Sequence, residues 1–181
     1  MNKKRLIAGL TSLVCCAGML SLMPATVSYA AEIVHNDFEV TYEGWHGTNM
    51  EVSIEAVNGI GYGGTRGMLV SGRKSAQDGA EASKGLYLVG DIDYKYSVWV
   101  SSDTDETFHL MLTCDDMDTQ ESTTIELDTK NVTAGEWTEM GANFKAPKNS
   151  CEFRLTIITE SENDFVFDEL NVTTMESKKA D

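Results

Sequence analysis

The sequence predicts an all-β protein, a two-sheet antiparallel β-sandwich of the jelly-roll type. Apolar and polar residues alternate with period two in several short segments, and β-branched and aromatic residues fill those segments. Turns rich in glycine and asparagine separate the segments at short spacing, as in sandwiches and jelly rolls. No long amphipathic helical pattern follows residue 30.

Residues 1–30 predict a secretory signal peptide. A basic start leads into an apolar stretch over residues 6–23, Pro24 ends it, and small residues follow up to Ala30. Cleavage is therefore expected between Ala30 and Ala31. The apolar stretch is too short for a comfortable membrane anchor, and its two cysteines lack a good lipid-attachment sequence. We expect a secreted, extracellular protein with no membrane contact beyond the signal.

Length and charge limit the partners of the mature chain. The 151 residues that remain of 181 make one domain by size. The formal net charge of −15 becomes −18 once the three basic residues of the signal are removed. Nucleic acid and anionic membranes are therefore excluded as partners, because they require basic patches. A neutral polymer or a cation remains admissible.

The strands can be placed in order along the mature chain. We expect the first at about residues 33–38 and the last at about 164–172. Alternation is clearest at 97–101, 108–113 and 153–158, and within the last strand at 165–168. A sandwich that begins and ends with a strand typically pairs these two strands, so we expect them side by side. Residues 173–181 are polar, which predicts a flexible tail.

Two cysteines remain after processing, Cys114 and Cys151. An even count in a secreted protein permits a disulfide, which would stabilise the fold by roughly 3–4 kcal/mol in the chain-entropy model. Two buried free thiols, as in a protein from an anaerobe, are the alternative. The sequence leaves both open.

Catalysis finds little support in the sequence. It has no Gly-x-Ser-x-Gly elbow, and His35, His46 and His109 lack the spacing of a catalytic triad or a zinc site. The acidic segments 103–106 and 115–118 lack the glycine and the distant glutamate of a helix-loop-helix calcium site, so they predict solvated turns. Paired carboxylates for glycoside hydrolysis stay open, because their separation depends on the fold. We expect no enzyme activity from this domain alone.

The aromatic residues divide into packed and free candidates. Trp99 and Trp137 lie within strand patterns, where packing is the expectation. Trp45 follows the first strand, in a position to close one end of the core. Tyr42 and Tyr62 lie in loops and are freer to meet a ligand.

Five segments occur in a recognisable order over residues 33–172. They are Asn36-Asp37-Phe38-Glu39 with Gly44-Trp45, Arg66–Arg73, Tyr96–Val100, Gly135–Thr138 and Phe165–Leu170. Together they resemble carbohydrate-binding modules of family 22 and the related family 4, which are galactose-binding-like jelly rolls. The resemblance implies that residues 31–172 form a non-catalytic module of a larger glycoside hydrolase such as a xylanase. It also implies that xylan or mixed-linkage β-glucan binds in a shallow cleft.

Few of the binding residues of such modules carry over. The replaced positions are Thr48 (arginine in the family), Gln77 (a stacking tryptophan), and Ser122 and Ile158 (both tyrosines). The cleft glutamate is retained as Glu160. The resemblance therefore predicts that Glu160, with Arg73 and Gln77, hydrogen-bonds a polysaccharide. A structural or protein-interaction sandwich that has lost sugar binding is the alternative.

The resemblance also implies a structural calcium ion that joins the first strand to the last. The matching ligands are the Asp37 carbonyl, the Glu39 carboxylate and the Asp168 carboxylate, with carbonyls of the Thr65-Arg66 turn. An oxygen-only set of ligands suits a hard cation. A hydrogen bond from Asp168 to a turn, without an ion, is the alternative.

Overall fold

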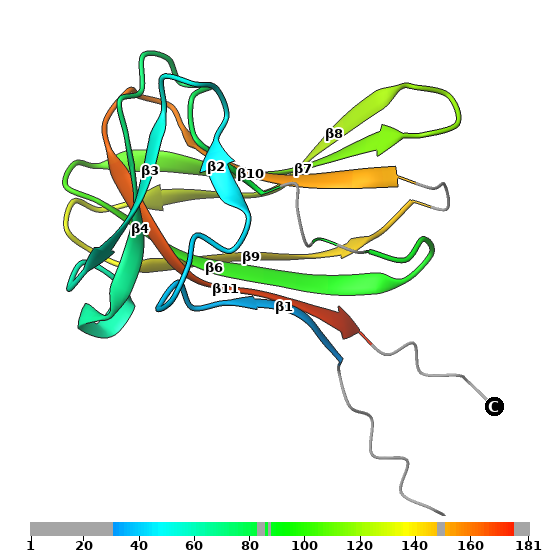
Figure 1. The fold of residues 1–181 in the computed structure, drawn as a ribbon, viewed down its shortest axis with the longest axis horizontal. Coiled ribbons are helices and arrows are strands. Elements are labelled where there is room, and N and C mark those ends of the chain that lie inside the picture. The colour runs from blue at the N-terminus through cyan, green and yellow to red at the C-terminus, as the bar shows by residue number, and fades with distance from the viewer. Residues whose placement is uncertain (1–30, 83–85, 87, 148–150, 176–181) are drawn as a thin grey trace, which may run out of the picture.

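Two antiparallel sheets face each other in the computed structural model, which describes residues 31–82, 86, 88–147 and 151–175 (Figure 1). Within these residues the helical element is one short 3₁₀ turn, η1 (Tyr62–Gly64). The β-sandwich predicted from the alternating pattern is confirmed.

The first sheet has six strands in the order β3-β4-β11-β6-β9, with β1 also paired to β11. Their bounds are β1 Glu32–Asn36, β3 Ser53–Asn58, β4 Arg66–Ser71, β6 Asp93–Ser102, β9 Thr138–Lys145 and β11 Phe165–Met175. Strand β4 pairs with residues 165–167 of β11, and β1 pairs with residues 170–173. The partner of β11 therefore changes from β4 to β1 around Asp168.

The second sheet has five strands in the order β2-β5-β10-β7-β8. Their bounds are β2 Trp45–Gly47, β5 Ala80–Ala82, β7 Glu106–Asp116, β8 Ser122–Val132 and β10 Cys151–Thr159. Neighbouring strands are antiparallel throughout. Burial alternates along β10, so one face lies on the core and the other faces outward.

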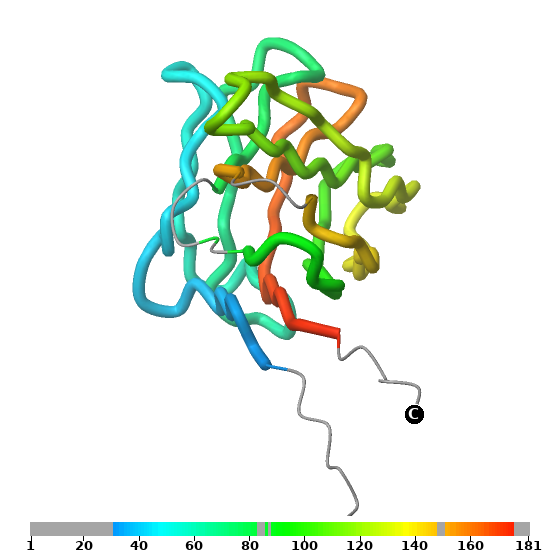
Figure 2. Tube along the Cα trace, turned by 90° about the vertical axis from the view of Figure 1, so that its right-hand side faces the viewer, coloured from blue at the N-terminus to red at the C-terminus, as the bar shows by residue number. Residues whose placement is uncertain are grey.

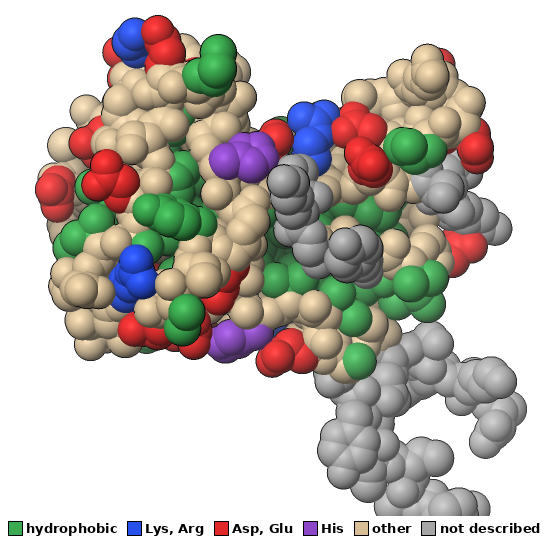
Figure 3. Space-filling model, in the orientation of Figure 1, with side chains coloured by type: hydrophobic (Ala, Val, Ile, Leu, Met, Phe, Trp, Pro, Cys, Tyr) green, Lys and Arg blue, Asp and Glu red, His purple; other side chains and the backbone are tan. Residues whose placement is uncertain are grey.

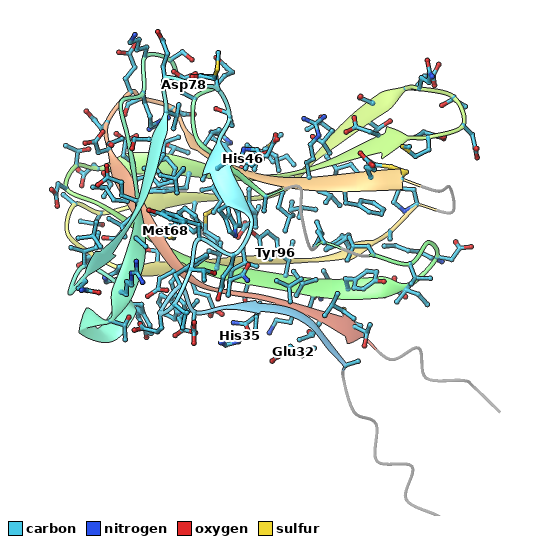
Figure 4. All side chains as sticks on the ribbon, viewed as in Figure 1. Glu32, His35, His46, Met68, Asp78 and Tyr96 are labelled. Atoms are coloured by element: carbon cyan, nitrogen blue, oxygen red, sulfur yellow. A yellow bond between two sulfur atoms is a disulfide. The ribbon has the colours of Figure 1, made fainter. Side chains whose placement is uncertain are left out.

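The core lies between the two sheets, where Met68 and Tyr96 are fully buried (Figure 4). Phe167 is the centre of an aromatic group, with ring centroids 5.3 Å from Phe38 and 4.6 Å from Trp45. Each side chain of this size stabilises the fold by about 1.5–3 kcal/mol when buried. Trp45 packs against the core, as expected from the sequence. Phe38 adopts φ 56°, and strand β1 ends at Asn36, two residues earlier than predicted.

The first and last strands lie side by side, as predicted (Figures 1 and 2). Strand β11 continues to Met175, and residues 173–175 pair with β6. These three residues were predicted to belong to the flexible tail, but the pairing with β6 makes them part of the sheet. Residues 176–181 of the predicted tail and the predicted signal peptide at 1–30 lie outside the described residues.

Cys114 and Cys151 form a disulfide that joins β7 to β10, with their Cα atoms 5.4 Å apart. Of the two alternatives that the sequence leaves open, the structure contains the cross-link. It fastens adjacent strands of the five-stranded sheet at the end where β7 leads into β8.

Candidate functional site

The outward face of the five-stranded sheet is largely polar, with the apolar Met111 and Ile158 among its polar side chains. On β7, Thr107, His109 and Met111 alternate with buried residues, and on β10, Thr156 and Ile158 do the same. Antiparallel pairing places these side chains in rows across the strands, because residues in register point to the same face. His46 on β2 extends the surface past β5 (Figure 4).

His109 lies at the centre of this face between two carboxylates. Its Nδ1 is 2.5 Å from Glu126 Oε1 on β8, and its Nε2 is 3.7 Å from Glu160 Oε1 after β10. Thr129 Oγ1 donates to the same Glu126 oxygen at 2.5 Å. The pKa of Glu126 is lowered, first by the Thr129 hydrogen bond and then by the one to His109. Glu160 is 66% exposed, so its carboxylate remains available to a ligand.

An ion-pair network occupies the same face nearer the disulfide. Arg154 Nε donates to Asp115 Oδ2 at 2.8 Å and its second terminal nitrogen donates to Asp115 Oδ1 at 3.1 Å. Glu81 Oε2 lies 3.4 Å from the other terminal nitrogen, and Ser122 Oγ donates to Asp115 Oδ1 at 2.5 Å. The Arg154 hydrogen bond, then the Ser122 one, holds the pKa of Asp115 below its ordinary value. This network fixes four polar side chains, one on each of the strands β5, β10, β7 and β8.

A polar hollow of about 520 Å³ opens beside Glu160 where β7, β8 and the loop after β10 meet. Its lining residues are Asp105, Glu106, Thr107, Asn131, Val132, Thr133, Glu160, Ser161 and Asn163. Glu106 is nearly buried and accepts hydrogen bonds from Asn163 Nδ2 at 2.7 Å and from Ser161 Oγ. Hydroxyl, amide and carboxylate groups therefore converge here, which is the donor and acceptor set that hydroxylated ligands require.

Arg73 is 6% exposed, and its guanidinium is engaged by the protein. Nε donates to the Asp78 carbonyl, and one terminal nitrogen donates to Thr159 Oγ1 and the Asn163 carbonyl, each at 2.6 Å. The guanidinium carbon lies 5.1 Å from the ring centre of Phe165. Burial lowers the pKa of Arg73, although nearby carboxylates, Glu106 foremost, oppose the shift. Arg73 thus braces the loop that carries Glu160.

The three predicted sugar-binding residues differ in exposure: two are exposed and one is buried. Glu160 is exposed on the polar face, Gln77 is exposed in the turn before Asp78, and Arg73 lies beneath them. Their contact with a sugar remains a prediction. The sequence prediction missed the pairing of His109 with Glu126 and of Arg154 with Asp115. The alternating pattern places each of these strands, but only the register brings the partners together.

The three predicted calcium ligands lie around the change of partner on β11. Asp168 is fully buried, and its carboxylate accepts hydrogen bonds from Tyr62 N at 2.9 Å and Thr65 Oγ1 at 3.0 Å. Glu39 Oε1 accepts from Arg66 N at 2.9 Å, and Asp37 Oδ1 accepts from Glu39 N at 3.1 Å. Two carboxylates thus meet the Thr65-Arg66 turn.

Burial raises the pKa of Asp168, although the hydrogen bonds from the backbone and from Thr65 lower it. The carboxylates of Asp168 and Glu39 are of the ligand type that a hard cation prefers. Both oxygens of Asp168 already accept hydrogen bonds, Oδ2 from Tyr62 N and Thr65 Oγ1 and Oδ1 from Glu169 N. In the described part of the chain, no group of three or more His, Cys, Asp or Glu side chains is suited to a metal ion. An ion at this place would depend on backbone carbonyls for the rest of its ligands.

Acidic side chains are scattered over the visible surface, with few basic ones among them (Figure 3). This distribution agrees with a solvated acidic surface and offers no extended basic patch on that face. Searched over the described residues alone, the structure has no helix with the length and apolar character needed to cross a membrane.

The chain matches known sequences over most of its length. A family model described as "Carbohydrate binding domain" matches residues 30–164. Endo-1,4-beta-xylanase Y of Acetivibrio thermocellus is 43% identical over 178 residues, a match that covers 96% of this chain. The chain spans 16% of the length of that xylanase.

Solved structures agree with this match. The N-terminal endo-1,4-beta-D-xylanase 10B modules of Clostridium thermocellum, CBM22-1 and GH10 complexed with xylohexaose, align with a TM-score of 0.76 and 45% identity. That alignment covers 79% of this chain and 28% of the other. The CBM22-1 xylan-binding domain of Paenibacillus barcinonensis Xyn10C aligns with a TM-score of 0.74 over 82% of this chain and 97% of its own, at 15% identity. At that identity the likeness shows the fold alone.

Proposed function

Since this chain belongs to the carbohydrate-binding domain family, we propose that it is a module of a secreted glycoside hydrolase and binds plant cell-wall xylan or β-glucan. The domain itself is non-catalytic, as the members of this family are. The family resemblance inferred from the five sequence segments is confirmed by the family match and by the identity to xylanase modules. The choice of xylan rests on what the similar proteins are named for.

The observation that carries the proposal is the polar face of the five-stranded sheet. His109, Glu126 and Glu160 offer acceptors and donors in a row, and the hollow beside Glu160 adds the side chains of Thr107 and Asn131. A neutral polysaccharide presents many hydroxyl groups and no charge, so the acidity of the chain does not repel it. Residues from β7, β8 and the loop after β10 would hydrogen-bond successive sugar rings along the face.

The experiment is isothermal titration with xylohexaose, soluble xylan, mixed-linkage β-glucan and mannan. Glu160→Gln is expected to weaken binding at least about tenfold, because a hydrogen bond to a charged acceptor contributes roughly 1.5–3 kcal/mol. Glu162→Gln is the matched control, since Glu162 is exposed in the same loop. No binding to any of the four by the unsubstituted protein would refute the proposal.

A protein-interaction sandwich is the second candidate. Within the described residues of β2, β5, β7, β8 and β10, no tryptophan, tyrosine or phenylalanine is exposed on the outward face. Stacking of rings on sugars supplies much of the apolar burial in carbohydrate sites, so this face lacks one source of affinity. Absence of polysaccharide binding together with recovery of a cell-surface protein partner would favour this candidate.

A structural calcium ion at Asp168 and Glu39, with the Asp37 carbonyl, is part of the proposal. It is supported by the buried carboxylate of Asp168 and by the Glu39 carboxylate, both of which contact the Thr65-Arg66 turn. The ion would neutralise that charge and hold β1, the η1 turn and β11 together. Its role would be structural, with no part in sugar chemistry.

Secretion is also proposed, on the strength of the residues 1–30 pattern alone. Expression of the full chain in a secreting bacterium, followed by N-terminal sequencing of the exported protein, tests it. A mature protein that begins at Ala31 is the expected result. Retention of residues 1–30 on the product would contradict it.

A further inference from the structure

Three half-exposed aromatic rings gather on the outward face of the other, six-stranded sheet. Tyr62 in η1 stacks on Trp99 of β6, with ring centroids 4.0 Å apart and planes 14° apart. Trp137, just before β9, meets Tyr62 edge-on at 5.9 Å and 76°. Trp99 and Trp137 were expected to be packed, from their place in strand patterns, but both are only partly buried. The rings missing from the polar face are therefore present on the opposite side of the sandwich.

Trp137 lines a hollow of about 300 Å³ next to this cluster. Val57, Leu69 and Val166 form an apolar floor from the neighbouring strands β3, β4 and β11, and Ile60 adds to it. Trp137 is only partly buried, and part of its side chain lines this hollow. A flat apolar face of a ligand can therefore lie along the indole.

Polar groups stand on one side of the same hollow. Ser101, Asp103 and Asp164 line it, and the lining contains no lysine or arginine. Both carboxylates belong to exposed residues. This combination excludes anionic ligands, and it offers acceptors for the hydroxyl groups of a ligand whose other face is apolar. A pyranose ring has these two kinds of surface.

We propose that the hollow lined by Trp137, Leu69, Val166, Asp103 and Asp164 is a second carbohydrate subsite, which takes a single neutral pyranose of a polysaccharide. The ring stacks on the Trp137 indole, and its hydroxyl groups donate to Asp103 and Asp164. The ligand class rests on the proposed function, whereas the location is independent of the polar face. The size of the hollow suits one sugar ring and is too small for a helix or a strand of a protein partner.

The two hollows lie on either side of one rim of loops. The loop after β6 supplies Asp103 to this hollow and Asp105 to the one beside Glu160. The loop after β10 likewise supplies Asp164 to the first and Ser161 to the second. A polysaccharide that crosses the rim would occupy both, and the second contact would then be intramolecular. An oligosaccharide long enough to reach both hollows is therefore expected to gain more affinity than the same number of added sugar rings would give within one hollow.

Backbone amide shifts in a two-dimensional NMR titration with xylohexaose test the inference. The unsubstituted protein should show two groups of shifting amides, one at Thr107 and Asn131 and one at Ser101 and Val166. Trp137→Ala should abolish the second group and keep the first. Tyr42→Ala, which removes an exposed ring outside the hollow, should keep both.

Several results decide the matter. The subsite would be overturned if Trp137→Ala kept the ligand-induced shifts at Ser101 and Val166. It would also be overturned if the unsubstituted protein showed no shifts there while the polar face responded. Either result would leave the proposed function intact. Absence of shifts on both faces would overturn both. If Trp137→Ala does not fold, Asp103→Ala replaces it, because Asp103 is exposed, and a weakened response of at least about threefold at Ser101 and Val166 is expected.

Discussion

Arg73 holds together two loops that border the polar face. Its guanidinium satisfies carbonyls from two loops, Asp78 on one side and Asn163 on the other. It lies over the Phe165 ring, which itself packs on Phe108. The loop position of Glu160 therefore depends on a buried cation.

Arg73→Met is expected to lower the free energy of unfolding by about 2–4 kcal/mol, because buried carbonyls lose their donors. Urea-induced unfolding followed by fluorescence measures it. Lys74→Met is the control, since the exposed Lys74–Glu51 pair contributes less than about 1 kcal/mol. If Arg73→Met kept full stability but lost sugar binding, direct contact with the sugar would be its role instead.

Asp115 makes stability depend on pH. Its folded pKa lies below the ordinary value of 3.8, because Arg154 and Ser122 stabilise the charged form. Its contribution is therefore complete above that ordinary value and is lost as the pH falls through the lower folded pKa. Unfolding free energies measured from pH 6 to pH 2.5 should fall less steeply in Asp115→Asn than in the unsubstituted protein. Equal slopes would mean that the ion pair contributes nothing.

The strands differ in how well the sequence reveals them. Strands β6, β7, β10 and β11 alternate apolar and polar residues, so their existence could be predicted. Strand β8 is exposed along most of its length and shows no apolar alternation, so it could not. The residues of the candidate site also differ in how far the sequence reveals them. Glu160 could be placed on the outward face from the alternation of β10. Its neighbour His109 depends on register across β7 and β10, which period-two patterning does not specify.

Calcium bound at Asp168 and Glu39, where the pairing of β11 changes from β4 to β1, is expected to stabilise the fold. Protein dialysed against EDTA should gain about 5–10 °C in Tm when Ca²⁺ is added at a hundredfold its Kd, and less with Mg²⁺. Asp168→Asn should remove this gain, and Asp118→Asn, an exposed acid elsewhere, should retain it. A Ca²⁺-independent Tm in the unsubstituted protein would rule out the ion.

The disulfide between β7 and β10 should contribute substantially to stability. For a sequence separation of 37, the chain-entropy model gives about 3–4 kcal/mol. The double substitution Cys114→Ala/Cys151→Ala is expected to lose that amount in urea unfolding. Reductant should destabilise the unsubstituted protein and leave the double variant unchanged; equal sensitivity in both would argue against the cross-link.

For the whole molecule, the formal net charge of −15, which would become −18 if residues 1–30 were removed, should make the domain bind neutral polymers in preference to anionic ones. Binding to neutral xylan should change less than about twofold between 20 mM and 500 mM NaCl, because no ion pairs with the ligand form. A carboxymethylated β-glucan should bind poorly at low salt and better at high salt, as screening reduces repulsion. Salt titration by affinity electrophoresis measures both, and tighter binding of the carboxymethylated polymer at low salt would refute the electrostatic account.

The pairing of β1 with β11 has a mechanical consequence. Ala31 and Thr174 are hydrogen-bonded neighbours at the outer end of this pair, where the described chain begins and β11 is near its end (Figure 2). A pull applied to the two ends of the domain would load these antiparallel hydrogen bonds one at a time, as in opening a zipper. Strand β1 would separate from β11 under low force. The disulfide-linked five-stranded sheet lies outside the line of tension, so it would stay folded and bound to an insoluble polysaccharide.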